Sequence, residues 1–155
     1  MTSGRLTATE MRAWRAYAET IDHLRAALEA DLVPHGLSLG DYEVLVILSE
    51  SVDGRLRMCD LSNELGLSPS GLTRRLDGLV KADYVARTQG TSDRRVMYAS
   101  ITSEGRHALQ RAVPDHVRSV RTHLIDRLTP AQVTALGDIF RAVGDGLGRQ
   151  SRSGT

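Results

Sequence analysis

The hydrophobic and polar positions of this chain follow the period of amphipathic helices through much of its length. Residues 8–33 carry apolar side chains at alternating steps of three and four, after a capping box that Thr7 and Glu10 can form. Residues 104–147 continue this period in two stretches, the first with apolar positions as far as Leu128, and Pro114 is placed to kink the first without ending it. Ser38, Thr102 and Thr129 are further N-cap candidates, each just before a helical pattern. We therefore predict one mainly α-helical domain in which both regions are long helices.

Shorter elements are expected between these regions, in residues 38–101. Leu61 and Leu65 lie four apart on one short helical segment. Ser68 is a natural N-cap for the next helix. Pro69 fits the first position of that helix, because an N–H there would have no partner within the helix and proline has no N–H. Two helices joined by so short a connection have the spacing of a helix-turn-helix.

The second helix of this pair has two different faces. Its apolar residues fall on a stripe that should pack inward: Leu72, Leu76, Leu79 and Val80. The residues that should face outward are short, polar or charged: Ser70, Thr73, Arg74 and Asp77. Hydroxyl groups can bind phosphates or bases and arginine can bind guanine through two hydrogen bonds, so this face fits the major groove of DNA. Taken alone, the same pattern also fits an ordinary surface helix.

A small β-sheet is expected beside this helix. Residues 84–87 and 96–101 are strand-like and are joined by a polar, basic segment that contains glycine, while residues 56–58 should add a short third strand. A two-stranded wing of this kind can place cations in a neighbouring minor groove, where negative potential concentrates when the groove is narrow. The predicted fold class is therefore mainly α with a small antiparallel β wing.

The charge distribution supports an interface with nucleic acid. The formal net charge of the chain is only +1, but residues 68–98 hold six basic and three acidic residues, whereas residues 1–50 hold four basic and eight acidic residues. Positive charge is thus concentrated where the helix-turn-helix and the wing are expected. No stretch approaches the apolar length of a membrane span and no targeting segment is found, so we expect a cytoplasmic protein that does not enter a membrane.

No group of residues predicts an enzyme, a cofactor or a metal site. Cys59 is the only cysteine, which excludes an intrachain disulfide and fits a reducing compartment. We interpret it as a small buried residue rather than a reactive thiol, although it lies near a helix N-terminus. His116 and His123 could share a helix face, but two histidines without a matching acidic cluster make a poor metal site, and we interpret them as solvated or interface residues.

Three features together resemble the MarR family of winged helix-turn-helix regulators. They are the helix-turn-helix, a wing that contains Asp93-Arg94-Arg95, and residues 101–105 at the start of a long helix. The likeness runs from about residue 10 to residue 147 and includes residues 37–45.

The resemblance implies a single domain with two lobes and a tail. The winged helix-turn-helix would occupy residues 38–101, and the dimerisation helices would occupy residues 8–33 and 104–147. Residues 148–155 are rich in glycine, serine and arginine and are expected to be a flexible tail.

The family's Asp-x-Arg wing pattern falls on Asp93 and Arg95, and in that family the carboxylate orients the arginine that enters the minor groove. Two residues apart on a strand, they should share a face. Asp83 replaces the glycine that usually ends the recognition helix and should tolerate the left-handed conformation there. The full set of candidate DNA-binding residues is Ser68, Ser70, Thr73, Arg74, Arg75, Asp93, Arg94 and Arg95.

Three aromatic residues are candidates for binding a small molecule. Trp14, Tyr17 and Tyr42 could line a crevice between the lobes, where members of the resembled family bind small, often aromatic or phenolic, effectors. Packing in the hydrophobic core is the alternative for all three.

The helices expected outside the DNA-binding unit carry apolar seams that need something to pack against. The seam of the first helix consists of Trp14, Tyr17, Ile21, Leu24 and Leu28, and that of the last helix consists of Val133, Leu136, Phe140, Val143 and Leu147. They could pack on each other within one chain, or on the same helices of a second chain around a two-fold axis. The symmetry of DNA half-sites and the family resemblance favour a homodimer.

The sequence thus predicts a homodimeric regulator of transcription that binds double-stranded DNA, as a repressor on an inverted-repeat operator that a small ligand releases. The alternative is a winged-helix dimer that binds protein or acts as a scaffold, and salt-dependent, sequence-specific DNA binding would separate the two. A dimerisation domain of an enzyme is disfavoured, because the chain continues past the wing into its own capped helices and leaves no room for a catalytic domain.

Overall fold

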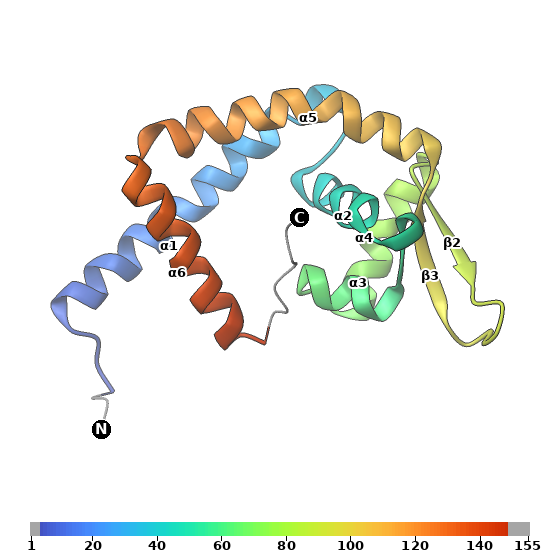
Figure 1. Cartoon of the computed structure of the whole chain (residues 1–155), viewed down its shortest axis with the longest axis horizontal. Helices are drawn as coiled ribbons and strands as arrows, with labels where there is room; N and C mark the ends of the chain where they lie inside the picture. Colours follow the sequence, from blue (N-terminus) through green and yellow to red (C-terminus); the bar gives the residue numbers. More distant parts are fainter. Residues whose placement is uncertain (1–3, 149–155) are drawn as a thin grey trace.

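The computed structural model describes residues 4–148 and has two lobes that one long helix connects (Figure 1). Helix α5 (Ser103–His123) runs from the β-sheet at one end to α1 (Ala8–Ala30) and α6 (Pro130–Gly146) at the other. Except for Gly148, the tail predicted over residues 148–155 lies outside the described residues. None of the helices in residues 4–148 combines the length and the apolarity that crossing a bilayer requires.

The helices begin where the sequence predicts. Capping boxes start α1 at Thr7, α2 (Leu39–Glu50) at Ser38 and α6 at Thr129. Thr102 caps α5 by accepting a hydrogen bond from the backbone N–H of Gly105 at 2.9 Å. Short polar side chains thus pair backbone donors that the first turn of a helix leaves open.

Two of the predicted helix ends were wrong. Helix α1 ends at Ala30 rather than near Val33, and a 3₁₀ turn, η1 (Val33–His35), follows it, because Leu32 turns into the hydrophobic core and is fully buried. Helix α5 continues through Pro114 as predicted but ends at His123, so that Leu128 lies beyond it, after the 3₁₀ turn η3 (Ile125–Arg127).

The hydrophobic core fills the lobe that contains the helix-turn-helix. This motif consists of α3 (Met58–Leu65) and α4 (Pro69–Lys81), joined at Gly66, which has the left-handed conformation that ends a helix. The fully buried leucines of this core are Leu32, Leu45, Leu48, Leu61, Leu72 and Leu76. Leu109 and Ala112 of α5 also belong to it, so the core extends beyond residues 38–101, the range predicted for the winged helix-turn-helix.

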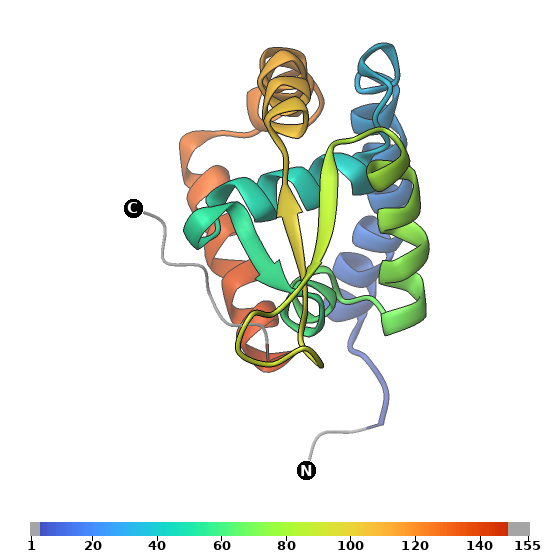
Figure 2. The same ribbon diagram turned by 90° about the vertical axis from the view of Figure 1, so that its right-hand side faces the viewer.

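The sheet has three antiparallel strands in the order β1-β3-β2, with the predicted wing between β2 and β3 (Figure 2). Strands β2 (Val85–Gln89) and β3 (Met97–Ile101) pair so that Val85 lies opposite Ile101. Strand β1 (Arg55–Arg57) is shifted by one residue from the predicted 56–58, and it ends at Arg57 because Met58 already belongs to α3. Another short 3₁₀ turn, η2 (Val52–Gly54), leads into β1.

The helical lobe has the opposite pattern of burial. Neither α1 nor α6 contains a buried residue. Large apolar side chains on both remain in contact with solvent, and an aromatic cluster lies between them, in which the rings of Tyr17 and Phe140 are 6.3 Å apart. A single copy of the chain therefore leaves large apolar side chains on the seams of α1 and α6 in contact with solvent.

Two predicted burials were wrong. Cys59 is exposed rather than buried, because it lies in the first turn of α3 and the buried positions of this helix are taken by Leu61 and Ser62. Val80 is 37% exposed because it lies at the edge of the inward stripe of α4, which Leu72, Leu76 and Leu79 fill.

Candidate nucleic-acid interface

The recognition helix α4 is held in place by its apolar side. Leu72, Leu76 and Leu79 are buried in the core as predicted. At the start of the helix, the Ser68 hydroxyl accepts a hydrogen bond from the backbone N–H of Gly71 at 3.1 Å and lies 3.3 Å from the Ser70 hydroxyl. Of the candidate residues, Ser68 therefore already has a structural role as the helix cap.

The opposite side of α4 is exposed and carries the predicted groups. Ser70, Thr73 and Arg74 are all exposed. Thr73 donates its hydroxyl hydrogen to the carbonyl oxygen of Pro69 at 3.0 Å, so its oxygen remains an acceptor. Arg74 has no hydrogen-bond or ion-pair partner among residues 4–148, which leaves its guanidinium free to bind an external group.

A residue that the sequence did not single out ties the wing to the recognition helix. Arg87, on β2, donates to the backbone carbonyl of Thr73 at 2.9 Å and to the carboxylate of Asp77 at 2.8 Å. Asp77 is exposed as predicted, but its carboxylate is neutralised by this ion pair. Only the position of Arg87 in a strand-like segment next to α4 could have suggested this contact.

The tip of the wing is a turn that Asp93 organises. The Asp93 carboxylate accepts a hydrogen bond from the backbone N–H of Arg95 at 2.9 Å, and the N–H of Gly90 donates to the carbonyl of Val96 at 2.8 Å. The expectation that Asp93 and Arg95 share a face of a strand was wrong, because β3 begins only at Met97. Asp93 binds the main chain of Arg95 in this structure and thereby fixes the turn.

The wing and the start of the recognition helix lie at the same end of the lobe. The side chains of Arg94 and Arg95 are exposed at the tip of the wing. The chain reverses direction between α4 and β2, at Asp83, which has the left-handed conformation (φ 61°) as predicted. The wing tip therefore lies at the end where α4 begins, at the bottom of both views (Figures 1 and 2).

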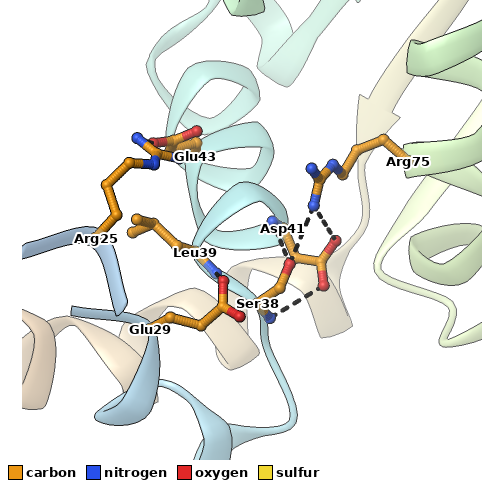
Figure 3. Close-up of polar contacts among 7 residues, drawn as sticks. All are labelled: Arg25, Glu29, Ser38, Leu39, Asp41, Glu43 and Arg75. Carbon is orange, nitrogen blue, oxygen red and sulfur yellow. Dashed lines mark hydrogen bonds and ion pairs between the residues drawn. The ribbon is translucent and has the colours of Figure 1, made fainter. Parts of the chain in front are cut away.

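Arg75 does not lie with these residues. Its guanidinium extends toward the N-terminus of α2, where Nη1 donates to the hydroxyl of Ser38 at 3.2 Å and lies 3.9 Å from the carboxylate of Asp41 (Figure 3). The structure thus separates Arg75 from the exposed face that contains Ser70, Thr73 and Arg74.

The three aromatic candidates fall into two groups. Trp14 and Tyr17 are exposed on α1, with ring centroids 5.8 Å apart. Tyr42 is buried, and its ring lies 4.2 Å from that of His116 on α5. Burial raises the pKa of Tyr42 and lowers that of His116, because it disfavours the charged form of each. No ring contact joins Tyr42 to the other two within the part of the chain that the structure describes.

A separate cavity of about 330 Å³ has a polar lining. It lies between the end of α1 and the second half of α5, and its lining residues are Asp31, Asp115, Arg118, Ser119, Thr122 and His123. His35 holds the pKa of Asp115 below its usual range through a 2.8 Å hydrogen bond. Within residues 4–148, no three histidine, cysteine, aspartate or glutamate side chains gather as metal ligands would.

Comparison with known proteins agrees with this geometry. Residues 37–97 match the family model of the MarR family. AbsC of Streptomyces coelicolor, a MarR family transcriptional regulator, is 39% identical, with a TM-score of 0.87 over 96% of this chain and 100% of that chain. Sco3205 of the same organism, solved in complex with DNA, is 38% identical, with a TM-score of 0.89 over 95% of this chain and 93% of that chain.

A curated relative extends the agreement. The transcriptional repressor YetL of Bacillus subtilis is 31% identical over 108 residues, which cover 68% of this chain and 65% of YetL, so the match spans just under two thirds of YetL. All three proteins are described as regulators of transcription, in agreement with the prediction that this chain is not an enzyme. On its sequence, its fold and the arrangement of its helix-turn-helix and wing, the chain belongs to the MarR family of winged helix-turn-helix transcriptional regulators.

Proposed function

We propose that the protein regulates transcription by binding a specific sequence of double-stranded DNA as a homodimer. One observation carries this proposal: the exposed polar face of α4 and the basic tip of the wing lie at one end of the same lobe. Sco3205, whose chain superposes over nearly its whole length, was solved in complex with DNA.

Each part of this surface has its own role in the proposal. Arg74 binds a base edge in the major groove, because its guanidinium is exposed and unpaired among the described residues. Ser70 and Thr73 bind phosphates and set the register of the helix on the duplex. Arg95 enters the adjacent minor groove and Arg94 adds charge beside it, while Asp93 holds the turn.

The dimer follows from the uncovered helical lobe. Trp14 on α1 is 56% exposed and Phe140 on α6 is 49% exposed, although both lie on the apolar seams of their helices. Isolated chains rarely leave contiguous apolar surface of this kind in water, and a second copy can cover it around a two-fold axis. Two recognition helices related by that axis would then bind an inverted repeat.

Repression and release by a small ligand complete the proposal. YetL, with which this chain shares 31% identity, is a repressor. Trp14 and Tyr17 lie on the exposed seam, so an effector pocket that includes them would be completed by the second chain. Tyr42 offers little surface to such a pocket, because the residue is 8% exposed. Aromatic or phenolic compounds fit these side chains best.

The test is to sequence the genomic DNA that the purified protein retains at near-physiological salt. We expect an inverted repeat with half-site centres about 10 base pairs apart or a multiple of that spacing. Arg74→Ala should then relax the preference at one base pair in each half-site, at a cost of about 1–3 kcal/mol in specific binding. A uniform loss across all sequences would make Arg74 a phosphate contact instead.

The second candidate function is a winged-helix scaffold that binds protein. The same uncovered seams and basic wing would suit it. Retention of random DNA with no enriched repeat, or no retention at all, would favour this alternative.

A further inference from the structure

Three elements meet at the first turn of α2. Ser38 and Asp41 form a reciprocal cap there: the Ser38 hydroxyl accepts from the N–H of Asp41 at 3.0 Å, and the Asp41 carboxylate accepts from the N–H of Ser38 at 3.1 Å. From α1, the Glu29 carboxylate accepts from the N–H of Leu39 at 3.2 Å. Three of the backbone donors at this helix start are therefore paired by side chains.

The third element is the recognition helix. Arg75 of α4 donates to the same Ser38 hydroxyl at 3.2 Å and lies 3.9 Å from the Asp41 carboxylate. Figure 3 shows the Arg75 guanidinium aimed at this cap from one side, while Glu29 approaches the helix start from the other side. The first turn of α2 thus lies between α1 and α4.

A glycine makes room for this contact. A Cβ atom built on Gly40, in the first turn of α2, would overlap the guanidinium of Arg75. The backbone of Gly40 does not need glycine for its conformation, since its φ angle lies outside the left-handed region. The missing side chain at this position therefore serves the approach of Arg75.

We propose that Arg75 is a positioning residue that fixes the orientation of the recognition helix against α2, and through Glu29 against α1. This inference rests on the proposed DNA-binding function and assigns Arg75 a role other than the phosphate or base contact that the sequence suggested. Arg74 and Arg75 are about 100° apart around the helix, so the first can face DNA while the second faces α2.

The reason for such a contact lies in the chemistry of the rest of the interface. Leu72 and Leu76 attach α4 to the core, but apolar packing has no preferred direction and allows small rotations of a helix. Hydrogen bonds from a planar guanidinium to a charged cap depend on direction. A helix that must place side chains within a fraction of an ångström of the positions that base recognition requires needs a directional contact such as this hydrogen bond.

The central experiment is Gly40→Ala, which displaces the Arg75 guanidinium without changing any charge or any DNA-facing residue. The matched control is Gly78→Ala, because it adds the same methyl group to a helix where nothing lies within 4 Å. We expect Gly40→Ala to weaken binding to the selected operator on the order of tenfold, with non-specific binding and the salt dependence unchanged. Gly78→Ala should leave the operator affinity near that of the wild type.

Arg75→Ala and Asp41→Asn separate positioning from direct binding of DNA. If Arg75 positions the helix, Arg75→Ala should resemble Gly40→Ala and leave the salt slope unchanged, whereas removal of a phosphate-binding cation would reduce that slope by about one. Asp41→Asn keeps an acceptor for the cap but removes the anion beside Arg75. A positioning role predicts weaker operator binding for this variant, whereas direct binding of DNA predicts equal or tighter affinity, because the guanidinium is released toward the duplex.

Thermal unfolding of each variant shows whether it is folded at the temperature of the binding assay. Operator affinities of Gly40→Ala and Asp41→Asn that equal the wild type would overturn the inference, as would a salt slope reduced by about one for Arg75→Ala. Failure of the proposed function is visible earlier, because the wild-type protein itself would then select no operator.

Discussion

The two lobes use similar apolar residues in opposite ways. In the DNA-binding lobe, Leu45, Leu72 and Leu76 are at most 1% exposed. In the helical lobe, α1 and α6 have apolar seams of the same period and bury no residue. Periodicity therefore predicts which face of a helix is apolar, but the element that covers this face depends on the assembly. The DNA-binding lobe buries its apolar residues within one chain, whereas the helical lobe leaves apolar side chains exposed.

The largest expected effect tests the packing of the DNA-binding lobe. Leu76→Ala removes a fully buried side chain and should lower the free energy of unfolding by about 2–5 kcal/mol, because it leaves a cavity beneath the recognition helix. Val52→Ala is the control, since Val52 is 84% exposed in the same lobe. Denaturant unfolding that gave similar losses for both would mean that the DNA-binding lobe is not packed around Leu76 as described.

The next prediction tests the exposed apolar seams of the helical lobe. Changing Leu136 and Phe140 of α6 together to glutamine should convert the proposed dimer into a monomer or unfold the protein, since each large apolar side chain contributes about 1.5–3 kcal/mol when buried. Sedimentation velocity at micromolar concentration measures this directly. Arg141→Gln, at an exposed neighbouring position, should remain a dimer. A wild-type monomer at that concentration would contradict the proposed assembly.

A smaller effect, on the affinity for DNA, is expected at the wing, which extends from the DNA-binding lobe. Arg95→Ala should weaken operator binding by about 1 kcal/mol and reduce the salt slope by about one for each phosphate that the arginine no longer neutralises. Binding titrations at several salt concentrations give both quantities. Arg12→Ala removes an exposed arginine from the helical lobe and should change neither. An unchanged affinity and slope for Arg95→Ala would show that the wing does not touch DNA.

The smallest expected effect lies where α5 crosses from one lobe to the other. Burial lowers the pKa of His116 below 6.5, so the unfolded chain takes up a proton more readily than the folded chain as the pH falls. Stability should therefore be highest above pH 6.5 and decline below it. His116→Phe keeps a ring against Tyr42 and should show a shallower decline between about pH 7 and 5 in thermal unfolding. An equal decline of stability with falling pH in the wild type and in His116→Phe would exclude His116 as the cause of that decline.

The features that the sequence predicted well are local ones. Ser38, Ser68 and Thr129 cap helices because a short polar side chain reaches the N–H three residues later, which needs no knowledge of the rest of the fold. The exposed face of α4 follows equally from helical period.

The features that it missed depend on contacts between distant segments. Arg75 and Arg87 both belong to the basic region, yet one binds the cap of α2 and the other binds Asp77. Composition cannot distinguish them from Arg74, which is free among residues 4–148. Which of these cations remains unpaired and exposed is decided by where α2 and β2 pack against α4.

The bridge from Arg87 to α4 has a consequence for the DNA itself. Because Arg87 holds both the carbonyl of Thr73 and the carboxylate of Asp77, β2 and the recognition helix should move as one rigid body. In the proposed complex, α4 lies in a major groove and the wing lies in the next minor groove. If the two are rigidly joined, they fix the angle through which the duplex must turn between these grooves. Sequences that are overtwisted or undertwisted over that half turn would have to deform in order to fit, and the energy of this deformation would enter their affinity. The affinity of the protein would then depend on the helical twist of base pairs that it does not contact.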